Sequence, residues 1–190
     1  EKEREYKIPV FAGGEAADGA NLGTKYHTVL EAMDLRQMDT VESIRKLLNQ
    51  LYKKGKLNEA DLKALDEKKL YRFTKSNIAK RMRKASDIGK LYKERQFIMG
   101  IKASEINSTL KSEELVLVQG IIDAYFEEEG QWVLVDYKTD SVYGDGAEEL
   151  LIKRYRVQLQ YYEKALEQLT GKKVKERIIY SFSLNKEVYL

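Results

Sequence analysis

The sequence predicts an α/β domain in which most helices precede most strands. Two observations support this prediction. Apolar residues recur at helical spacing through much of residues 21–87, and from residue 93 onward they gather in short runs rich in Val, Ile, Phe and Tyr. A chain of 190 residues can bury one sizeable core. We therefore expect a single domain over 1–190, divided into a mostly helical part (1–90) and a sheet-containing core (91–190).

Polar residues at helix starts and glycine after a helix end divide the first part into four helices. Asp39 followed by Glu42 fits a capping box, and Asn58 is a favourable N-cap. Gly55 stops the helix that begins near Asp39. The expected helices cover residues 21–33, 39–54, 58–73 and 76–87.

Strand patterns dominate the second part. The letters EEEGQ at 127–131 indicate a hairpin turn, because Gly130 can adopt a positive φ. A helix over about 151–169, closed by Gly171, precedes the last strands, which turn at Asn185. The expected strands lie within residues 93–103, 114–128, 131–139 and 175–190.

The composition excludes several kinds of site. The chain has no cysteine and one histidine, His27, which excludes disulfides, iron–sulfur clusters, thiolate or multi-histidine zinc sites and cysteine nucleophiles. A bound metal would be a hard cation held by carboxylates, such as Mg²⁺, Mn²⁺ or Ca²⁺. A Walker A motif is missing, so we expect no ATP binding by this segment. The chain begins at Glu1 rather than Met, which suggests a fragment of a longer protein. It has no signal-peptide pattern and no apolar run long enough to cross a membrane.

Positive charge is concentrated locally, although the net charge is only +3. Between Lys75 and Arg95 there are eight Lys or Arg residues against Asp87 and Glu94. This run could follow a polyanion backbone, with an aromatic ring available for base stacking, or could be an ordinary solvated helix face. The candidate nucleic-acid contacts are Lys80, Arg81, Arg83, Lys84 and Tyr92.

Charged residues interrupt the apolar hairpin at 119–142. Asp136 and Lys138 project from the same face of one strand, because side chains two residues apart share a face. The short turn brings Asp123 near Asp136. Two neighbouring carboxylates repel each other unless a cation lies between them, so a divalent metal is one explanation. A structural Asp–Lys ion pair is the other.

Three more elements carry polar residues that have ordinary explanations when taken singly. His27 lies on the first expected helix, and Glu94 lies just before the first apolar strand. Gln158 and Tyr162 are four residues apart, which places them one turn apart on one helix face. Taken alone, His27 could be a surface or capping histidine and Glu94 a surface carboxylate. The Gln158–Tyr162 pair could be ordinary packing at the rim of a helix.

Taken together, these residues resemble the RecB-family nuclease domain of the PD-(D/E)XK superfamily, and most closely the C-terminal nuclease domain of AddA-type helicase–nuclease subunits. The resemblance spans about residues 22–166. Ile122 stands where the superfamily name has proline, as is common in RecB-like members. The matching stretches, in the family's order, are GTKYHTVLE with His27, KERQF with Glu94, VQGIIDAYF with Asp123, VLVDYKTD with Asp136 and Lys138, and YRVQLQYYEKAL with Gln158 and Tyr162.

The resemblance implies a restriction-endonuclease-like core, a central mixed sheet flanked by helices, that hydrolyses DNA with Mg²⁺ or Mn²⁺. It implies exonuclease action on single strands delivered by a helicase portion of the same chain, with a second, AddB-like subunit, in bacterial double-strand break repair and recombination in the cytoplasm. Asp123, Asp136, Lys138, Gln158 and Tyr162 would be catalytic. The implied metal ligands are His27, Glu94, Asp123, Asp136 and the backbone carbonyl of Tyr137.

Two other classes of function remain open at this point. One is a non-catalytic DNA-binding or assembly module that keeps the nuclease fold. The other is a stand-alone nuclease or junction resolvase of the same fold. The presence of every ligand and of Lys138 argues against the first, since a decayed site usually loses one of them.

Overall fold

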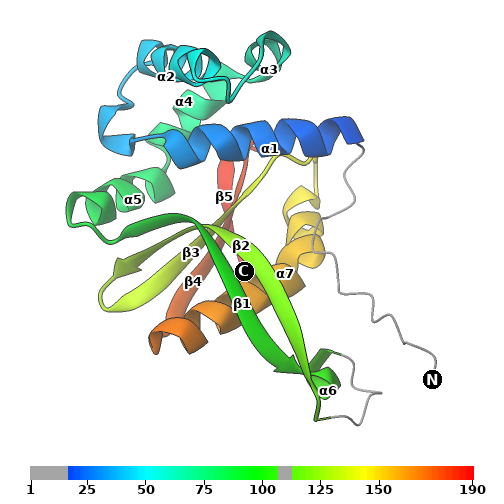
Figure 1. Ribbon diagram of the computed structural model, residues 1–190. Coiled ribbons are helices and arrows are strands. Elements are labelled where there is room, and N and C mark those ends of the chain that lie inside the picture. Colours follow the sequence, from blue (N-terminus) through cyan, green and yellow to red (C-terminus); the bar gives the residue numbers. More distant parts are fainter. Residues whose placement is uncertain (1–16, 107–112) are drawn as a thin grey trace.

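The computed structural model describes residues 17–106 and 113–190, so the first sixteen residues of the predicted helical part lie outside the described ranges. It is an α/β fold in which helices flank a five-stranded mixed sheet, as predicted (Figure 1). The strands follow one another across the sheet in chain order: β1 (Leu91–Lys102), β2 (Leu115–Glu128), β3 (Gln131–Lys138), β4 (Val174–Ser181) and β5 (Lys186–Tyr189).

The helices of the described ranges agree broadly with the sequence pattern. Within those ranges, no helix combines the length and apolar character needed to cross a bilayer. A short 3-10 turn, η1 (Leu35–Gln37), follows the first helix. The helices are α1 (Ala17–Ala32), α2 (Val41–Lys53), α3 (Glu59–Ala64), α4 (Glu67–Lys75), α5 (Asn77–Asp87), α6 (Ala103–Ile106) and α7 (Ala147–Thr170).

One predicted helix start and the extent of one predicted helix were wrong. The N-cap of α2 is Thr40 rather than Asp39, because the Thr40 hydroxyl accepts the backbone N–H of Ser43. The expected single helix over 58–73 is two helices. Asn58 caps α3 in a capping box as predicted, but Asp66 starts a new helix by accepting two backbone N–H groups at the start of α4. A second strong cap within one amphipathic run was the signal for that break.

Turn residues set the strand connections. Glu129 and Gly130, with φ of 55° and 78°, close the β2–β3 hairpin where the glycine predicted it. β3 and β4 are parallel and are joined across α7, while the other pairs are antiparallel. β3 is buried along most of its length because both of its faces are covered.

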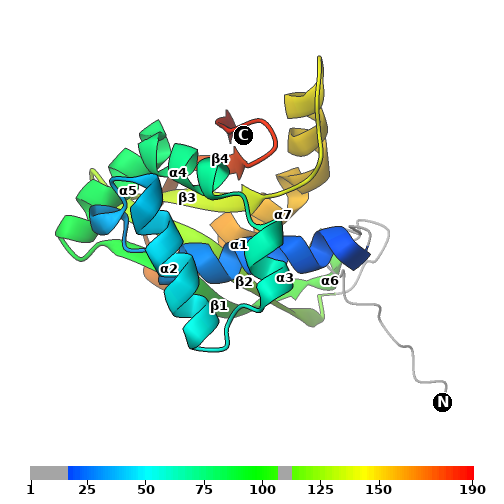
Figure 2. The same cartoon turned by 90° about the horizontal axis from the view of Figure 1, so that it is seen from above.

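Each face of the sheet has its own apolar core. Helices α1–α5 cover one face and pack on side chains such as Phe126, Val135 and Tyr180. Helix α7 covers the other face and packs on Phe97, Leu134 and their neighbours. Figures 1 and 2 show α1 lying across the strands, with α2 and α3 beyond it on the side away from the sheet.

At one point along β1 and β2, the side chains that face α7 change from residues of one parity to residues of the other. Along β2, Ile122 belongs to the core under α7, whereas Ala124 belongs to the core under α1–α5. Along β1, Phe97 faces α7, whereas Leu91 packs on the opposite core. In a regular strand, residues two apart lie on the same face, so the alternation of side chains is interrupted once in each strand. We call this interruption the phase shift. The shift lies at Glu94 and Asp123, between the paired residues Lys93–Ala124 and Arg95–Ile122.

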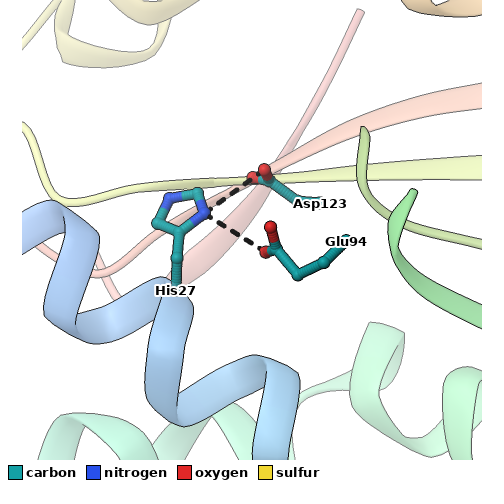
Figure 3. A group of neighbouring side chains, drawn as sticks. All are labelled: His27, Glu94 and Asp123. Atoms are coloured by element: carbon teal, nitrogen blue, oxygen red, sulfur yellow. Dashed lines mark ion pairs between the residues drawn. The ribbon is translucent and has the colours of Figure 1, made fainter. Parts of the chain in front are cut away.

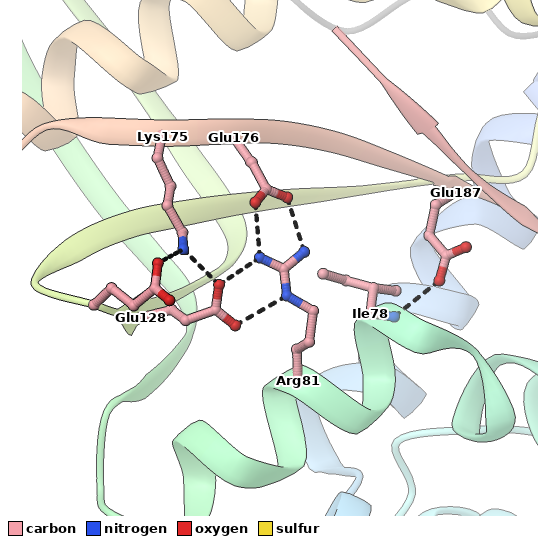
Figure 4. A network of polar contacts seen from close by, with 7 residues as sticks. Ile78, Arg81, Glu128, Lys175, Glu176 and Glu187 are labelled. Atoms are coloured by element: carbon pink, nitrogen blue, oxygen red, sulfur yellow. Dashed lines mark hydrogen bonds and ion pairs between the residues drawn. The ribbon is translucent and has the colours of Figure 1, made fainter.

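A cluster of ion pairs holds α5 against the sheet (Figure 4). The Arg81 guanidinium donates to Glu128 at the end of β2, at 2.7 and 3.0 Å, and to Glu176 on β4, at 2.8 and 2.9 Å. At the start of the helix, the backbone N–H of Ile78 donates to Glu187 on β5 at 2.8 Å. These contacts connect α5 to three strands and fix the position of this helix on the sheet.

Candidate metal and catalytic site

Three side chains from three elements converge at the level of the phase shift (Figure 3). His27 comes from α1, Glu94 from β1 and Asp123 from β2, and one ligand atom of each lies within 4.8 Å of the others. The Nδ1 atom of His27 is 3.3 Å from Asp123 Oδ1 and 3.6 Å from Glu94 Oε1. The sequence predicted all three residues. Glu94, however, lies inside β1 rather than just before it.

The charge on His27 follows from its two carboxylate neighbours. Burial alone would disfavour the imidazolium, but the contacts with Asp123 and Glu94 outweigh it and raise the pKa of His27 to about 10. The protonated ring therefore supplies positive charge between the two carboxylates. A divalent cation bound between these carboxylates would replace the proton on His27, because a histidine that ligates a metal must be neutral.

Asp136 and Lys138 adjoin this cluster on β3. The Asp136 side chain is only 1% exposed, and Lys138 Nζ lies 2.8 Å from its Oδ2 atom. Both Asp136 oxygens are buried, and neither accepts a hydrogen bond of acceptable angular geometry, so the close ammonium is a charge contact. Burial raises the pKa of Asp136, whereas Asp136 and Asp123 raise the pKa of Lys138 against the effect of its own burial.

A backbone contact links Asp123 to the strand that carries Asp136. The backbone N–H of Tyr137 donates to Asp123 Oδ2 at 2.7 Å, which confirms that Asp123 lies beside the segment carrying Asp136. The Tyr137 ring lies in the core under α1–α5, on the face of β3 opposite to Asp136 and Lys138, as the strand alternation predicted, and it meets the His27 ring edge-on with centroids 6.1 Å apart. The role of the Tyr137 carbonyl as a metal ligand stays a prediction.

Lys93 is a positioning residue that sequence reasoning missed. Its ammonium is partly buried and donates to the Leu30 carbonyl in the last turn of α1, at 3.0 Å, and more closely to the carbonyl of Met33, just past the end of that helix. Lys93 precedes Glu94 on β1, and Leu30 follows His27 by one helical turn. The lysine therefore fixes the helix that carries His27 onto the strand that carries Glu94. The sequence offered one indication of this role: a lysine at a strand position whose side chain faces the core.

Gln158 and Tyr162 lie together on the inward face of α7. Both are buried, and the Gln158 side-chain amide donates to the Tyr162 hydroxyl at 2.6 Å. The Tyr162 ring packs edge-on against Phe97 of β1, with centroids 5.6 Å apart. The charges of Asp136, Asp123 and Lys138 all act on the Tyr162 hydroxyl, so this helix face adjoins the acidic cluster.

The residues present fit a hard divalent cation. One imidazole nitrogen and carboxylate oxygens are donors that Mg²⁺ and Mn²⁺ accept, and two buried Asp136 oxygens without hydrogen bonds lie alongside. An isolated buried carboxylate is costly unless a positive charge approaches it. The described ranges show no other group of this kind.

The predicted nucleic-acid contacts are not gathered at this site. Arg81 is bound to Glu128, which is five residues beyond Asp123 along β2, roughly 17 Å at strand spacing. Arg83 donates to the Leu35 carbonyl. The Tyr92 ring stacks on Tyr125 at 5.0 Å instead of standing free. Lys80 and Lys84 are exposed on α5, and their contact with nucleic acid stays a prediction.

Comparison with known proteins agrees with this geometry. Residues 3–188 match the family model of the PD-(D/E)XK nuclease superfamily. The chain is 38% identical to the A subunit of the ATP-dependent helicase/nuclease of Lachnoclostridium phytofermentans, covering 95% of this chain and 16% of that protein. It is 40% identical to the protein of the same name from Clostridium novyi, covering 90% and 14%. The chain thus spans about a sixth of the length of these curated relatives.

The match extends over nearly the whole chain and includes every stretch that carries the candidate site. The resemblance predicted from His27, Glu94, Asp123, Asp136 and Lys138 is confirmed at the level of the family. The chain belongs to the PD-(D/E)XK nuclease superfamily.

Proposed function

We propose that the chain is a divalent-metal-dependent DNA nuclease that hydrolyses phosphodiester bonds. The observation that carries this proposal is the convergence of His27, Glu94 and Asp123 beside the buried Asp136–Lys138 pair. Acidic ligands next to a lysine suit a reaction in which negative charge accumulates on a phosphate. An ion pair with a purely structural role would not need a histidine and two further carboxylates around it.

In this proposal His27, Glu94, Asp123 and Asp136 hold Mg²⁺, or Mn²⁺ in its place. A cation held there would supply positive charge to the scissile phosphate and would lower the pKa of a bound water. Lys138 donates hydrogen bonds to the attacking water or to the phosphate oxygens, which stabilises the charge that develops as the water adds to phosphorus and the P–O bond breaks. Its nearness to Asp136 keeps the ammonium charged.

Gln158 and Tyr162 position the reacting groups from α7. Their mutual hydrogen bond fixes both side chains, and the Tyr162 ring is held by Phe97. In a buried site, polar groups held by such contacts need little reorganisation when the substrate arrives. We assign them to orienting Lys138 or the nucleic-acid backbone rather than to proton transfer.

The names and lengths of the relatives support a proposal about the substrate and partners. Those proteins are called helicase/nuclease subunits and are several times longer than this chain. We infer that residues 1–190 act as the exonuclease domain of such a protein in the bacterial cytoplasm, where double-strand breaks are repaired and recombined. In this scheme, the chain degrades single strands delivered by a motor on the same chain, and its partner is an AddB-like protein.

The proposal is tested with Asp136→Asn and Lys138→Gln, which each replace a charged side chain by a neutral amide. We expect each to reduce Mg²⁺-dependent degradation of linear single-stranded DNA by about 100-fold or more. Wild-type cleavage should disappear with EDTA and return with excess Mg²⁺. Removing one member of a buried pair also destabilises the fold, so circular dichroism and urea titration must accompany the assay.

Asp145→Asn and Lys153→Gln are the matched controls, since both residues are exposed and lie outside the site. They should leave the cleavage rate unchanged. Full cleavage by folded Asp136→Asn or Lys138→Gln would contradict the assignment. DNA binding by the wild type without any cleavage would instead indicate a non-catalytic module.

A further inference from the structure

The ammonium of Lys138 has a second neighbour besides Asp136. Its Nζ lies 4.3 Å from the centroid of the Tyr155 ring, within the range of a cation–π contact. Tyr155 belongs to α7 and is 4% exposed, so its ring presents a buried face to the lysine. The Lys138 ammonium therefore contacts both a carboxylate and an aromatic ring.

Tyr155 is itself fixed by an anchor at its far end. Its hydroxyl donates to the carboxylate of Asp140, whose two oxygens lie 2.7 and 2.8 Å away. Asp140 is 7% exposed and also accepts from Arg154. Asp140 follows Lys138 by two residues, so the segment that leaves β3 carries both the lysine and the anchor of the ring that contacts it.

Helix geometry connects this ring to the polar pair described above. Tyr155, Gln158 and Tyr162 are spaced three and four residues apart, which places them along one face of α7. All three are buried against the sheet. Tyr155 therefore continues the row of side chains that faces Asp136 and Lys138.

A lysine needs such support more than most catalytic groups do. Its flexible four-carbon stem allows many positions of the ammonium, and burial by itself does not select one. The carboxylate of Asp136 attracts the ammonium at 2.8 Å, and the face of the Tyr155 ring is a second attractive contact. Two contacts restrict the lysine to positions that satisfy both.

We propose that Tyr155 is a positioning residue that orients Lys138 for phosphodiester hydrolysis, and that Asp140 holds Tyr155 for this purpose. The inference rests on the proposed nuclease function for its catalytic consequence. Its structural content, an ordered Lys138 above the Tyr155 ring, stands on the contacts alone.

The test compares Tyr155→Leu, which removes the ring, with Tyr155→Phe, which keeps the ring and loses the hydroxyl. We expect Tyr155→Leu to lower kcat for linear single-stranded DNA by roughly 10- to 100-fold with little change in KM, because only the orientation of Lys138 is lost. Tyr155→Phe and Asp140→Asn both keep the ring and weaken or remove its anchor, so each should lower kcat by only about 2- to 5-fold.

A second measurement needs neither metal nor DNA. In the metal-free wild type, the Tyr155 ring current should shift the Lys138 ε-proton resonances upfield, and these resonances can be assigned from their loss in Lys138→Arg. The shift should persist in Tyr155→Phe and vanish in Tyr155→Leu. The control Tyr143→Leu replaces a tyrosine that is 71% exposed and should change neither kcat nor the shift.

Unchanged kcat in folded Tyr155→Leu, or a Lys138 resonance without an upfield shift in the wild type, would overturn the inference. If Tyr155→Leu does not fold, Asp140→Asn and Tyr155→Phe replace it. A reduced kcat in both supports the inference, and an unchanged kcat in both contradicts it. If the wild type does not cleave DNA, the proposed function fails, while the resonance comparison still tells whether Tyr155 orders Lys138.

Discussion

Glu94 has a backbone conformation that its residue type does not favour. Its φ is 47°, in the left-handed region, although it lies within strand β1. A side chain with a Cβ atom is strained there by about 1–2 kcal/mol, and such strain persists only where the surroundings enforce it. At this residue the strand changes phase and the carboxylate turns toward His27. The strain is thus linked to placing a ligand.

The strain gives a prediction about substitutions at this position. In the metal-free protein, Glu94→Gly should be more stable than Glu94→Ala by about 1 kcal/mol, because glycine adopts positive φ without penalty. Urea denaturation of the two variants measures the difference. Gln96, an exposed residue of the same strand with an ordinary φ, is the control: there the alanine variant should be the more stable. If the glycine and alanine variants ranked in the same order of stability at both positions, the backbone of Glu94 would not be strained.

Residue chemistry was the part of the site that could be predicted from the sequence. His27, Asp123, Asp136 and Lys138 carry groups with few uses in an apolar setting, so their types and order were informative. The left-handed φ of Glu94 could not be predicted, since it depends on the phase shift of two paired strands. Local sequence carries little information about such nonlocal constraints.

At the scale of elements, Gly120 of β2 allows α7 and β1 to meet. A Cβ atom at this position would lie 2.8 Å from the Phe97 ring, and that ring packs against Tyr162. Glycine inside a strand often marks a close approach of this kind. The glycine of the G-x-x-D stretch therefore has a packing role, separate from the chemistry of Asp123.

We predict that Gly120→Ala destabilises the protein by about 1–3 kcal/mol, because the Phe97 ring must move and is backed by Tyr162. Cleavage should also fall if Tyr162 shifts with it. Gly100→Ala is the matched control on β1, since its Cβ atom would meet Leu115 at an ordinary 3.6 Å. Equal stability of the two variants in urea denaturation would show that Phe97 relaxes freely.

Elements with a strong periodic signal and a clear stop were predicted well. The β2–β3 hairpin and the end of α7 at Gly171 follow from single residues that favour positive φ. The break between α3 and α4 was missed because Asp66 lies inside a run that keeps helical spacing. The short α6 was also missed, since four residues offer too little pattern to identify a helix.

At the scale of the whole molecule, the candidate site joins two layers. His27 belongs to a helix of the layer that contains α1–α5, whereas Glu94 and Asp123 belong to the sheet. Without a bound cation, the Lys93 hydrogen bonds and the Arg81 ion pairs already connect these two layers. A cation bound by all three ligands would add a further link, one that the unfolded chain cannot form.

We therefore predict that Mn²⁺ or Mg²⁺ raises the melting temperature of the isolated chain. A ligand that binds only the folded state at 100 times its Kd contributes about 2.7 kcal/mol, or roughly 5–10 °C for a protein of this size. EDTA should reverse the shift, and His27→Ala should remove most of it. The control Glu31→Gln changes an exposed carboxylate one turn further along α1 and should keep the full shift. An equal metal-induced shift in His27→Ala would mean that the helical layer does not contribute a ligand, and that the cation is held by the sheet carboxylates alone.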